Sequence, residues 1–171
     1  MMGSGKSTIG TLLARRTGWP YFDNDDLVEQ LGEMTARELL ADVGAVGLRS
    51  TEGAALRLGL TKPAPAIIAA AAGTILEEEN RRALRESALV VWLDAGPKTL
   101  ARRARGGAHR PFLDNEPEDW MRSTLRERAP LYKQTADLTV STQQRRPAGI
   151  ATVILDWLAD RVECAVPSRR S

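Results

Sequence analysis

The chain has 171 residues, of which 43% are hydrophobic and 27% charged, and its formal net charge is +2 at pH 7. This length predicts one domain with a sizeable buried core. The 24 basic residues are scattered among 22 acidic ones, which argues against nucleic acid as a partner. No apolar run reaches the roughly 18 residues of a membrane helix, so we expect no membrane partner.

Helical signals recur along the chain. A helix is expected over 7–16, where apolar residues share one face, and it should end near Gly18. Thr35 and Glu38 form a capping-box pattern at the beginning of another helix. Further helices are expected over 48–60, 77–86, 97–105, 120–128 and 147–162.

Short extended runs separate these helices. The stretch 88–93 is continuously apolar, which is typical of a strand covered on both faces. Strands alternating with helices predict an α/β fold with a doubly wound parallel sheet flanked by helices. The other expected strands are 19–22, 66–69 and 137–141.

No linker divides the chain, so we expect a single domain over 1–165. Glycines and prolines gather in the polar stretch 106–119, which favours a loop or lid. The stretch 166–171 is expected to be a disordered tail. The single cysteine excludes an internal disulfide and a zinc cluster and favours a reducing cytoplasm.

The chain opens with MMGSGKST, and Gly5, Lys6 and Ser7 match the end of the phosphate-binding pattern G-x-x-x-x-G-K-[ST]. In such a loop, backbone N–H groups and the helix N-terminus cradle phosphate oxygens. The lysine reaches the terminal phosphates and the hydroxyl ligates Mg²⁺. We therefore expect ATP and Mg²⁺ as cofactors, held by Gly3, Ser4, Gly5, Lys6, Ser7 and Thr8.

The first glycine of this pattern would lie at position zero, before Met1. Either the match arises by chance in a flexible terminus, or the chain lacks its true start. An amphipathic helix follows the loop directly, which favours the second interpretation. We then expect the strand that normally enters such a loop to be absent from this chain.

Several later stretches follow the loop in a definite order: FDNDD, LRSTE, a small-residue turn ending in Gly73, VVWLDA, RPFL, and RAPLY followed by ADLTV. Together with MMGSGKSTIG they resemble the shikimate kinase family, from Met1 to about Pro147. The resemblance implies a P-loop kinase fold and a role in aromatic amino acid biosynthesis. It also implies ATP-dependent phosphoryl transfer to a hydroxyl of a small carboxylated polyol, with shikimate, giving shikimate 3-phosphate, as the first choice.

Asp23 and Asp25 lie two positions apart after an expected strand. The resemblance implies that Asp23 lies near Mg²⁺ through water, and that Asp25 accepts a hydrogen bond from the acceptor hydroxyl. Magnesium takes few protein ligands, so Ser7 and one carboxylate suffice. Alternatively, Asp25 and Asp26 only favour the dipole at a helix N-terminus.

The resemblance also assigns arginines to the acceptor. Arg49 and Arg128 would clamp its carboxylate beside Ala72 and Gly73, and a planar guanidinium can hold a carboxylate with two hydrogen bonds. Either arginine could instead form a surface ion pair, and Glu52 could orient Arg49.

Further arginines are assigned to the nucleotide by the same resemblance. Arg110 would close over the phosphates as a lid residue and act in catalysis with Lys6 and Asp25. Arg103 would pack against adenine, and Arg145 would make another nucleotide contact.

One stretch departs from the family pattern, because Ala71, Ala72 and Gly73 stand where the family carries three glycines. The two extra methyl groups could crowd a ring-shaped acceptor or change the shape of the turn. Two alternatives therefore stay open: a related kinase for a different small hydroxy acid, and a nucleotide-binding homologue without turnover. In each case we expect a monomer in the cytoplasm.

Overall fold

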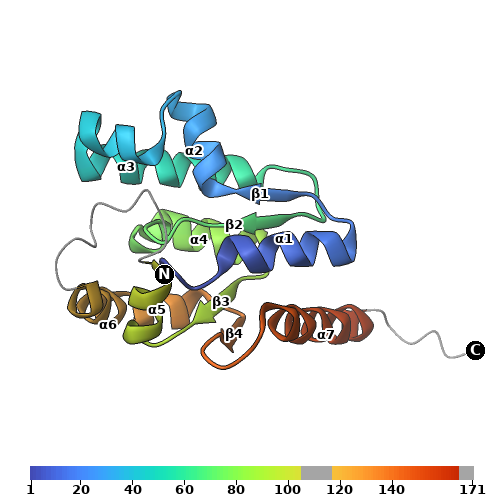
Figure 1. Cartoon of the computed structure of the whole chain (residues 1–171). Coiled ribbons are helices and arrows are strands. Elements are labelled where there is room, and N and C mark those ends of the chain that lie inside the picture. The colour runs from blue at the N-terminus through green and yellow to red at the C-terminus, as the bar shows by residue number, and fades with distance from the viewer. Residues whose placement is uncertain (105–116, 166–171) are drawn as a thin grey trace, which may run out of the picture.

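The computed structural model describes residues 1–104 and 117–165, in which helices alternate with short strands. Figure 1 shows α2 and α3 above β1 and β2, with α1 at a height between the two strand pairs, and α1 also packs against α7. No helix of the described residues is long and apolar enough to cross a membrane. The elements are α1 (Lys6–Thr17), β1 (Tyr21–Asp23), α2 (Asn24–Gly32), α3 (Ala36–Leu60), β2 (Ile67–Ala69), the 3-10 turn η1 (Thr74–Leu76), α4 (Glu78–Ser87), β3 (Val91–Asp94), α5 (Pro97–Ala104), α6 (Pro117–Thr135), β4 (Leu138–Ser141) and α7 (Pro147–Ala165).

The strands are parallel, as the sequence predicts. In the described residues their ladders form two pairs, β1 with β2 and β3 with β4. Asp23 lies opposite Ala69 at the carboxyl end of the first pair, and Asp94 lies opposite Ser141 at the carboxyl end of the second. Ligands of open α/β sheets bind at the carboxyl ends of the strands, so this topology predicts where a site should be.

The core consists of apolar clusters on both sides of the strands. One cluster joins α1 and α7 to β3 and β4 through Ile9, Leu93 and Ile154. A second joins α5 to α6 and contains Leu100 and Met121, both fully buried. A third holds α2 against α3. Each helix with a role in the site is therefore fixed by burial of its own apolar face.

Helix α2 follows β1 without a loop, and the sequence patterns above do not predict it as a helix. Asp23 ends the strand and caps the helix, because its Oδ1 accepts a hydrogen bond of 3.2 Å from the backbone N–H of Asp25. Asp25 and Asp26 lie in the first turn, where carboxylates favour the helix dipole. The acidic run is thus both a helix signal and a candidate site.

The expected lid range needs a correction at its end. Residues 117–119 belong to α6, which begins at Pro117, so the loop assigned to 106–119 is wrong there. Proline suits the first helical position, and Glu118 and Asp119 complement the dipole in the first turn. The remainder of the expected lid, 106–116, and the expected tail, 166–171, lie outside the described residues.

Helix α3 begins with the predicted capping box, in which Thr35 and Glu38 bond each other's backbone N–H groups. The helix is interrupted at Gly44, which has φ 69° and ψ −175°. Only glycine adopts this region without strain. The interruption sets the direction of the segment that follows, and that segment carries Leu48 and Arg49.

We expect Gly44→Ala to lower the free energy of unfolding by about 1–3 kcal/mol, which is the usual cost of backbone strain. A methyl group at Gly44 would have nothing within 4 Å, so steric overlap adds no cost. The measurement is urea unfolding followed by circular dichroism. Gly149→Ala in α7 is the matched control, because its methyl group also meets open space and its φ is not positive. The control should stabilise the chain by about 0.5–1 kcal/mol, and equal effects of the two changes would contradict the prediction.

Candidate active site

A cavity of about 860 Å³ lies where the loop before α1 meets the ends of β1 and β2. Helices α3, α5 and α6 supply its other walls. It brings together residues that are far apart in the sequence and that the patterns above select: Gly3, Gly5, Lys6, Ser7, Thr8, Asp23, Asp25, Arg49, Ala72, Gly73, Arg103 and Arg128.

The loop before α1 has the geometry of a phosphate site. Gly5 caps the helix with φ 96°, and α1 begins at Lys6. Gly3 lies against α5, and a Cβ at this position would be 2.6 Å from the carbonyl oxygen of Leu100. Lys6 donates a hydrogen bond of 3.1 Å from Nζ to the carbonyl oxygen of Met1. The backbone N–H groups of the first turn and this ammonium together favour an anion.

Ser7 and Asp23 form the candidate metal site. Ser7 Oγ donates a hydrogen bond of 2.9 Å to Asp23 Oδ2, across the junction between α1 and β1. Hydroxyl and carboxylate oxygens are the ligands that Mg²⁺ prefers, and this ion usually keeps several waters. No group of three or more His, Cys, Asp or Glu side chains in the described residues could hold a metal. This donor set fits Mg²⁺ held by one or two side chains and by substrate phosphates.

Arg49 and Glu52 meet at the turn after β2. A Cβ at Gly73 would overlap Nη1 of Arg49 and would lie 2.5 Å from Oε2 of Glu52. Burial raises the pKa of Glu52 above its usual value, and the nearby charge of Arg49 opposes this shift. Oε2 of Glu52 is buried without a hydrogen-bond partner, so no bond from Arg49 satisfies it. Glu52 therefore acts on Arg49 through charge and contact.

Arg128 and Tyr132 of α6 hold the same turn from the other side. Both donate to the carbonyl oxygen of Ala72, Arg128 from Nη1 at 3.2 Å and Tyr132 from its hydroxyl at 3.0 Å. The ring of Tyr132 stacks on Trp92 of β3, with centroids 5.5 Å apart. Burial raises the pKa of Tyr132 to about 12, so its hydroxyl stays a donor. Arg128 is therefore a buried cation at the cavity wall and not a surface ion pair.

Four of the predicted nucleotide residues lie in different surroundings. Arg103 lines the cavity and donates to Thr142, at 3.0 Å to Oγ1 and at 2.7 Å to the carbonyl oxygen. Arg145 is exposed and is not among the described residues that line the cavity. Ser4 lies in the loop but is buried, and it is not among the lining residues either. Arg110 lies outside the described residues.

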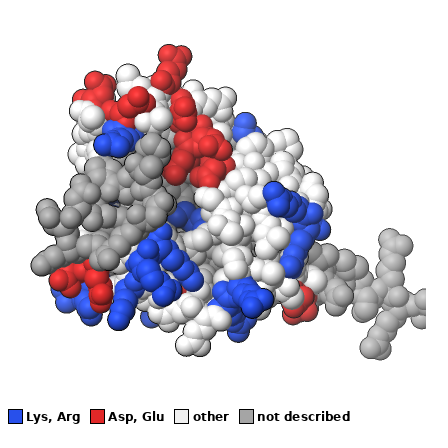
Figure 2. Space-filling view, in the orientation of Figure 1, with Lys and Arg blue, Asp and Glu red and all other residues white. Residues whose placement is uncertain are grey.

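Charge is unevenly distributed over this face of the molecule. Figure 2 shows acidic side chains gathered over α2 and basic ones below them, around α5. Helix α5 carries Lys98, Arg102 and Arg103. Of these three residues Arg103 lines the large cavity, whose wall also carries the cations Lys6, Arg49 and Arg128 and the carboxylates of Asp23 and Asp25.

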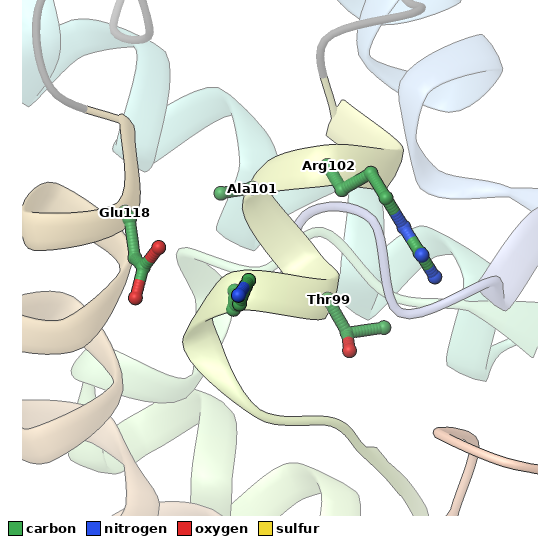
Figure 3. Close-up of a pocket in the computed structure, with 5 residues that line it drawn as sticks. Thr99, Ala101, Arg102 and Glu118 are labelled. Atoms are coloured by element: carbon green, nitrogen blue, oxygen red, sulfur yellow. The ribbon is translucent and has the colours of Figure 1, made fainter.

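A second cavity of about 320 Å³ lies between α5 and α6. Figure 3 shows Glu118 reaching into the space between the two helices, whereas Arg102 extends away from it. Glu118 is paired with Arg122 at 3.0 Å. The charged groups of this cavity do not converge, and we assign it no chemistry. Its other lining residues are Lys98, Thr99 and Ala101.

The sequence patterns missed three residues that support the site: Tyr21, Tyr132 and Thr142. Tyr21 donates a hydrogen bond of 2.6 Å to Asp23 Oδ2. Tyr132 donates to the turn after β2, and Thr142 accepts a hydrogen bond from the guanidinium of Arg103. Tyr132 and Thr142 act on partners that only the fold brings near, so spacing in the sequence carries no signal for them. Tyr21 lies two residues before Asp23 on one strand, and the alternation of a strand puts their side chains on the same face.

The chain is similar to known proteins over most of its length. The family model described as "Shikimate kinase" matches residues 2–159. The shikimate kinase of Symbiobacterium thermophilum is 38% identical over 166 residues, covering 95% of both chains. That of Rhodopirellula baltica is 38% identical over 158 residues, covering 90% of this chain and 84% of the relative.

Solved structures agree with the sequence relatives. The structure titled "Shikimate kinase from Acinetobacter baumannii in complex with shikimate" superposes with a TM-score of 0.88 at 30% identity, covering 94% of this chain and 89% of that one. The predicted resemblance and the α/β P-loop kinase fold are thereby confirmed. The chain belongs to the shikimate kinase family and is a small-molecule kinase that uses ATP with Mg²⁺.

Proposed function

We propose that this protein transfers the γ-phosphoryl group of ATP to a hydroxyl of shikimate. The observation that carries the proposal is the single cavity in which a phosphate loop faces a carboxylate and two arginines. The relatives named shikimate kinase, and the similar structure titled as a complex with shikimate, support this acceptor.

The residues divide into a nucleotide side and an acceptor side. Lys6 and the N–H groups of the first turn of α1 would hold the phosphates, and Ser7 and Asp23 would hold Mg²⁺. The metal, when bound, neutralises charge on the phosphate oxygens. A guanidinium has five N–H donors, so the bond of Arg128 to Ala72 leaves others for the acceptor carboxylate, together with Arg49.

Asp25 is the group placed to accept the proton. The acceptor oxygen forms a bond to the γ-phosphorus, the bond from that phosphorus to the β–γ bridging oxygen breaks, and ADP leaves. The hydroxyl proton passes to the Asp25 carboxylate. Asp25 lies two residues beyond Asp23, in the first turn of α2 and on the wall of the cavity that contains Lys6. Catalysis then comes from positioning and from charge rather than from covalent chemistry of the protein.

The alanines of the turn have backbone dihedral angles that any residue can adopt. Glu33 is the only non-glycine residue with positive φ in the described part of the chain, so Ala71 and Ala72 fit without strain. Both methyl-bearing residues line the cavity. A different small hydroxy acid is therefore the second candidate acceptor, and a homologue without turnover is the third reading. We also infer that the enzyme is a monomer and that it is cytoplasmic, a location that its single cysteine suits.

Lys6→Met should lower kcat for shikimate-dependent ADP release by at least about a hundredfold, because a cation that stabilises the transferring phosphoryl group is lost. The measurement is coupled detection of ADP with Mg-ATP, with and without shikimate. Lys62→Met is the matched control, since Lys62 contacts the ring of Phe22 and does not line the cavity. If ADP release does not depend on shikimate but does depend on another hydroxy acid, shikimate is not the acceptor, and the kinase activity still stands. Binding of Mg-ATP without any acceptor-dependent release would support the homologue without turnover.

Gly73→Ala should raise the KM for shikimate and lower kcat/KM about ten- to a hundredfold, because the new methyl group would displace Arg49 and Glu52. Affinity for ADP, measured by isothermal titration, should change little, since the phosphate loop is untouched. Gly149→Ala again serves as the control, because the same methyl group is added where nothing lies within 4 Å. An unchanged KM in the Gly73 variant would mean that Arg49 does not hold the acceptor.

A further inference from the structure

Tyr21 is the residue next to the candidate metal site for which the proposed function has no role. Its hydroxyl donates a hydrogen bond of 2.6 Å to Asp23 Oδ2. The same oxygen accepts the hydroxyl of Ser7 at 2.9 Å, and Oδ1 accepts the backbone N–H of Asp25 at 3.2 Å. A carboxylate offers about four lone-pair sites, so three donors hold Asp23 in one orientation.

The ring of Tyr21 is itself fixed by α1. A Cβ at Gly10 would overlap Cε2 of this ring and would lie 3.1 Å from Cδ2. The ring therefore lies directly on the helix backbone at Gly10, one turn after Ser7. Tyr21 is half-buried there, and its hydroxyl is directed to Asp23 rather than to open solvent.

The hydroxyl of Tyr21 is a hydrogen-bond donor to the carboxylate of Asp23. The phenol hydroxyl has one hydrogen to donate, and at 2.6 Å it donates it to Asp23 Oδ2. The charge of Asp23 makes this bond stronger than one between neutral groups.

We propose that Tyr21 is a positioning residue for the Mg²⁺ site. It holds the Asp23 carboxylate so that Oδ2 accepts the hydrogen bond from the Ser7 hydroxyl. The lone pairs of the Ser7 oxygen then remain for the metal. Without the Tyr21 hydroxyl, one lone-pair site on Oδ2 is released and Asp23 can turn away from Ser7. This inference rests on the proposed function, because it takes Ser7 and Asp23 as the metal site.

The test is Tyr21→Phe, which removes one oxygen atom and keeps the ring over Gly10. The readout is Mn²⁺ affinity in the presence of ADP, measured by electron paramagnetic resonance, since Mn²⁺ prefers the same oxygen ligands. We expect affinity for Mn²⁺ to fall about tenfold, the low end for loss of a residue that orients a ligand. Affinity for ADP in EDTA should be unchanged. Thr152→Val is the control: it removes a hydroxyl that donates to the Ala148 carbonyl within α7, outside the cavity, and should leave Mn²⁺ affinity unaltered.

A double-mutant cycle with Asp23→Asn separates the possible outcomes. If Tyr21 acts through Asp23, Tyr21→Phe has no further effect on Mn²⁺ affinity in the Asp23→Asn background. Additive effects would show that Tyr21 acts by another route and would overturn the inference. The inference also fails if Tyr21→Phe alone leaves Mn²⁺ affinity unchanged while Asp23→Asn weakens it, and the metal site then stands. If Asp23→Asn has no effect, the metal site of the proposed function fails as well.

Discussion

The hydrogen bond of 2.9 Å between Ser7 and Asp23 is the contact on which the geometry of the site depends. It joins the first turn of α1 to the junction of β1 and α2. Asp23 ends the strand, caps the following helix through the N–H of Asp25, and accepts the Ser7 hydroxyl. One side chain therefore sets the position of the phosphate loop relative to Asp25. Because the strand end and the helix start are both rigid, little conformational freedom remains to be lost when ligands bind.

The acceptor side depends on a second shared atom, the carbonyl oxygen of Ala72. Arg128 and Tyr132 reach it from α6, while Arg49 approaches the next residue of the turn from α3. A helix on each side thus holds the turn, and both arginines remain on the cavity wall. Arg128 is buried and Arg49 half-buried, and taking cations out of water is costly unless they are paired. Glu52 supplies one negative charge beside Arg49, and a bound carboxylate would supply the second.

The sequence predicts those parts of the fold and of the site that depend on interactions between residues close together in the chain. The phosphate loop, the capping box at Thr35 and the apolar strands depend on neighbours in the chain, and the structure contains them at the expected places, within a few residues. The bond of Tyr132 to Ala72 and the bond of Arg103 to Thr142 depend on partners that folding brings near, and no spacing encodes them. Arg145 is exposed and outside the described lining of the cavity, so its nucleotide contact stays a prediction.

The turn of Ala71, Ala72 and Gly73 shows that the type of a residue does not by itself reveal why that residue is needed at its position. From the sequence, glycines here would serve backbone freedom, and alanines would threaten the shape of the turn. Gly73 has φ −81°, which any residue adopts, and the alanines carry no positive φ. What requires glycine at 73 is space, because Arg49 and Glu52 occupy the volume of a side chain. The constraint therefore comes from the side chains of Arg49 and Glu52 and not from the backbone, so a kinase of this family can carry alanine at the other two positions while Arg49 keeps its place.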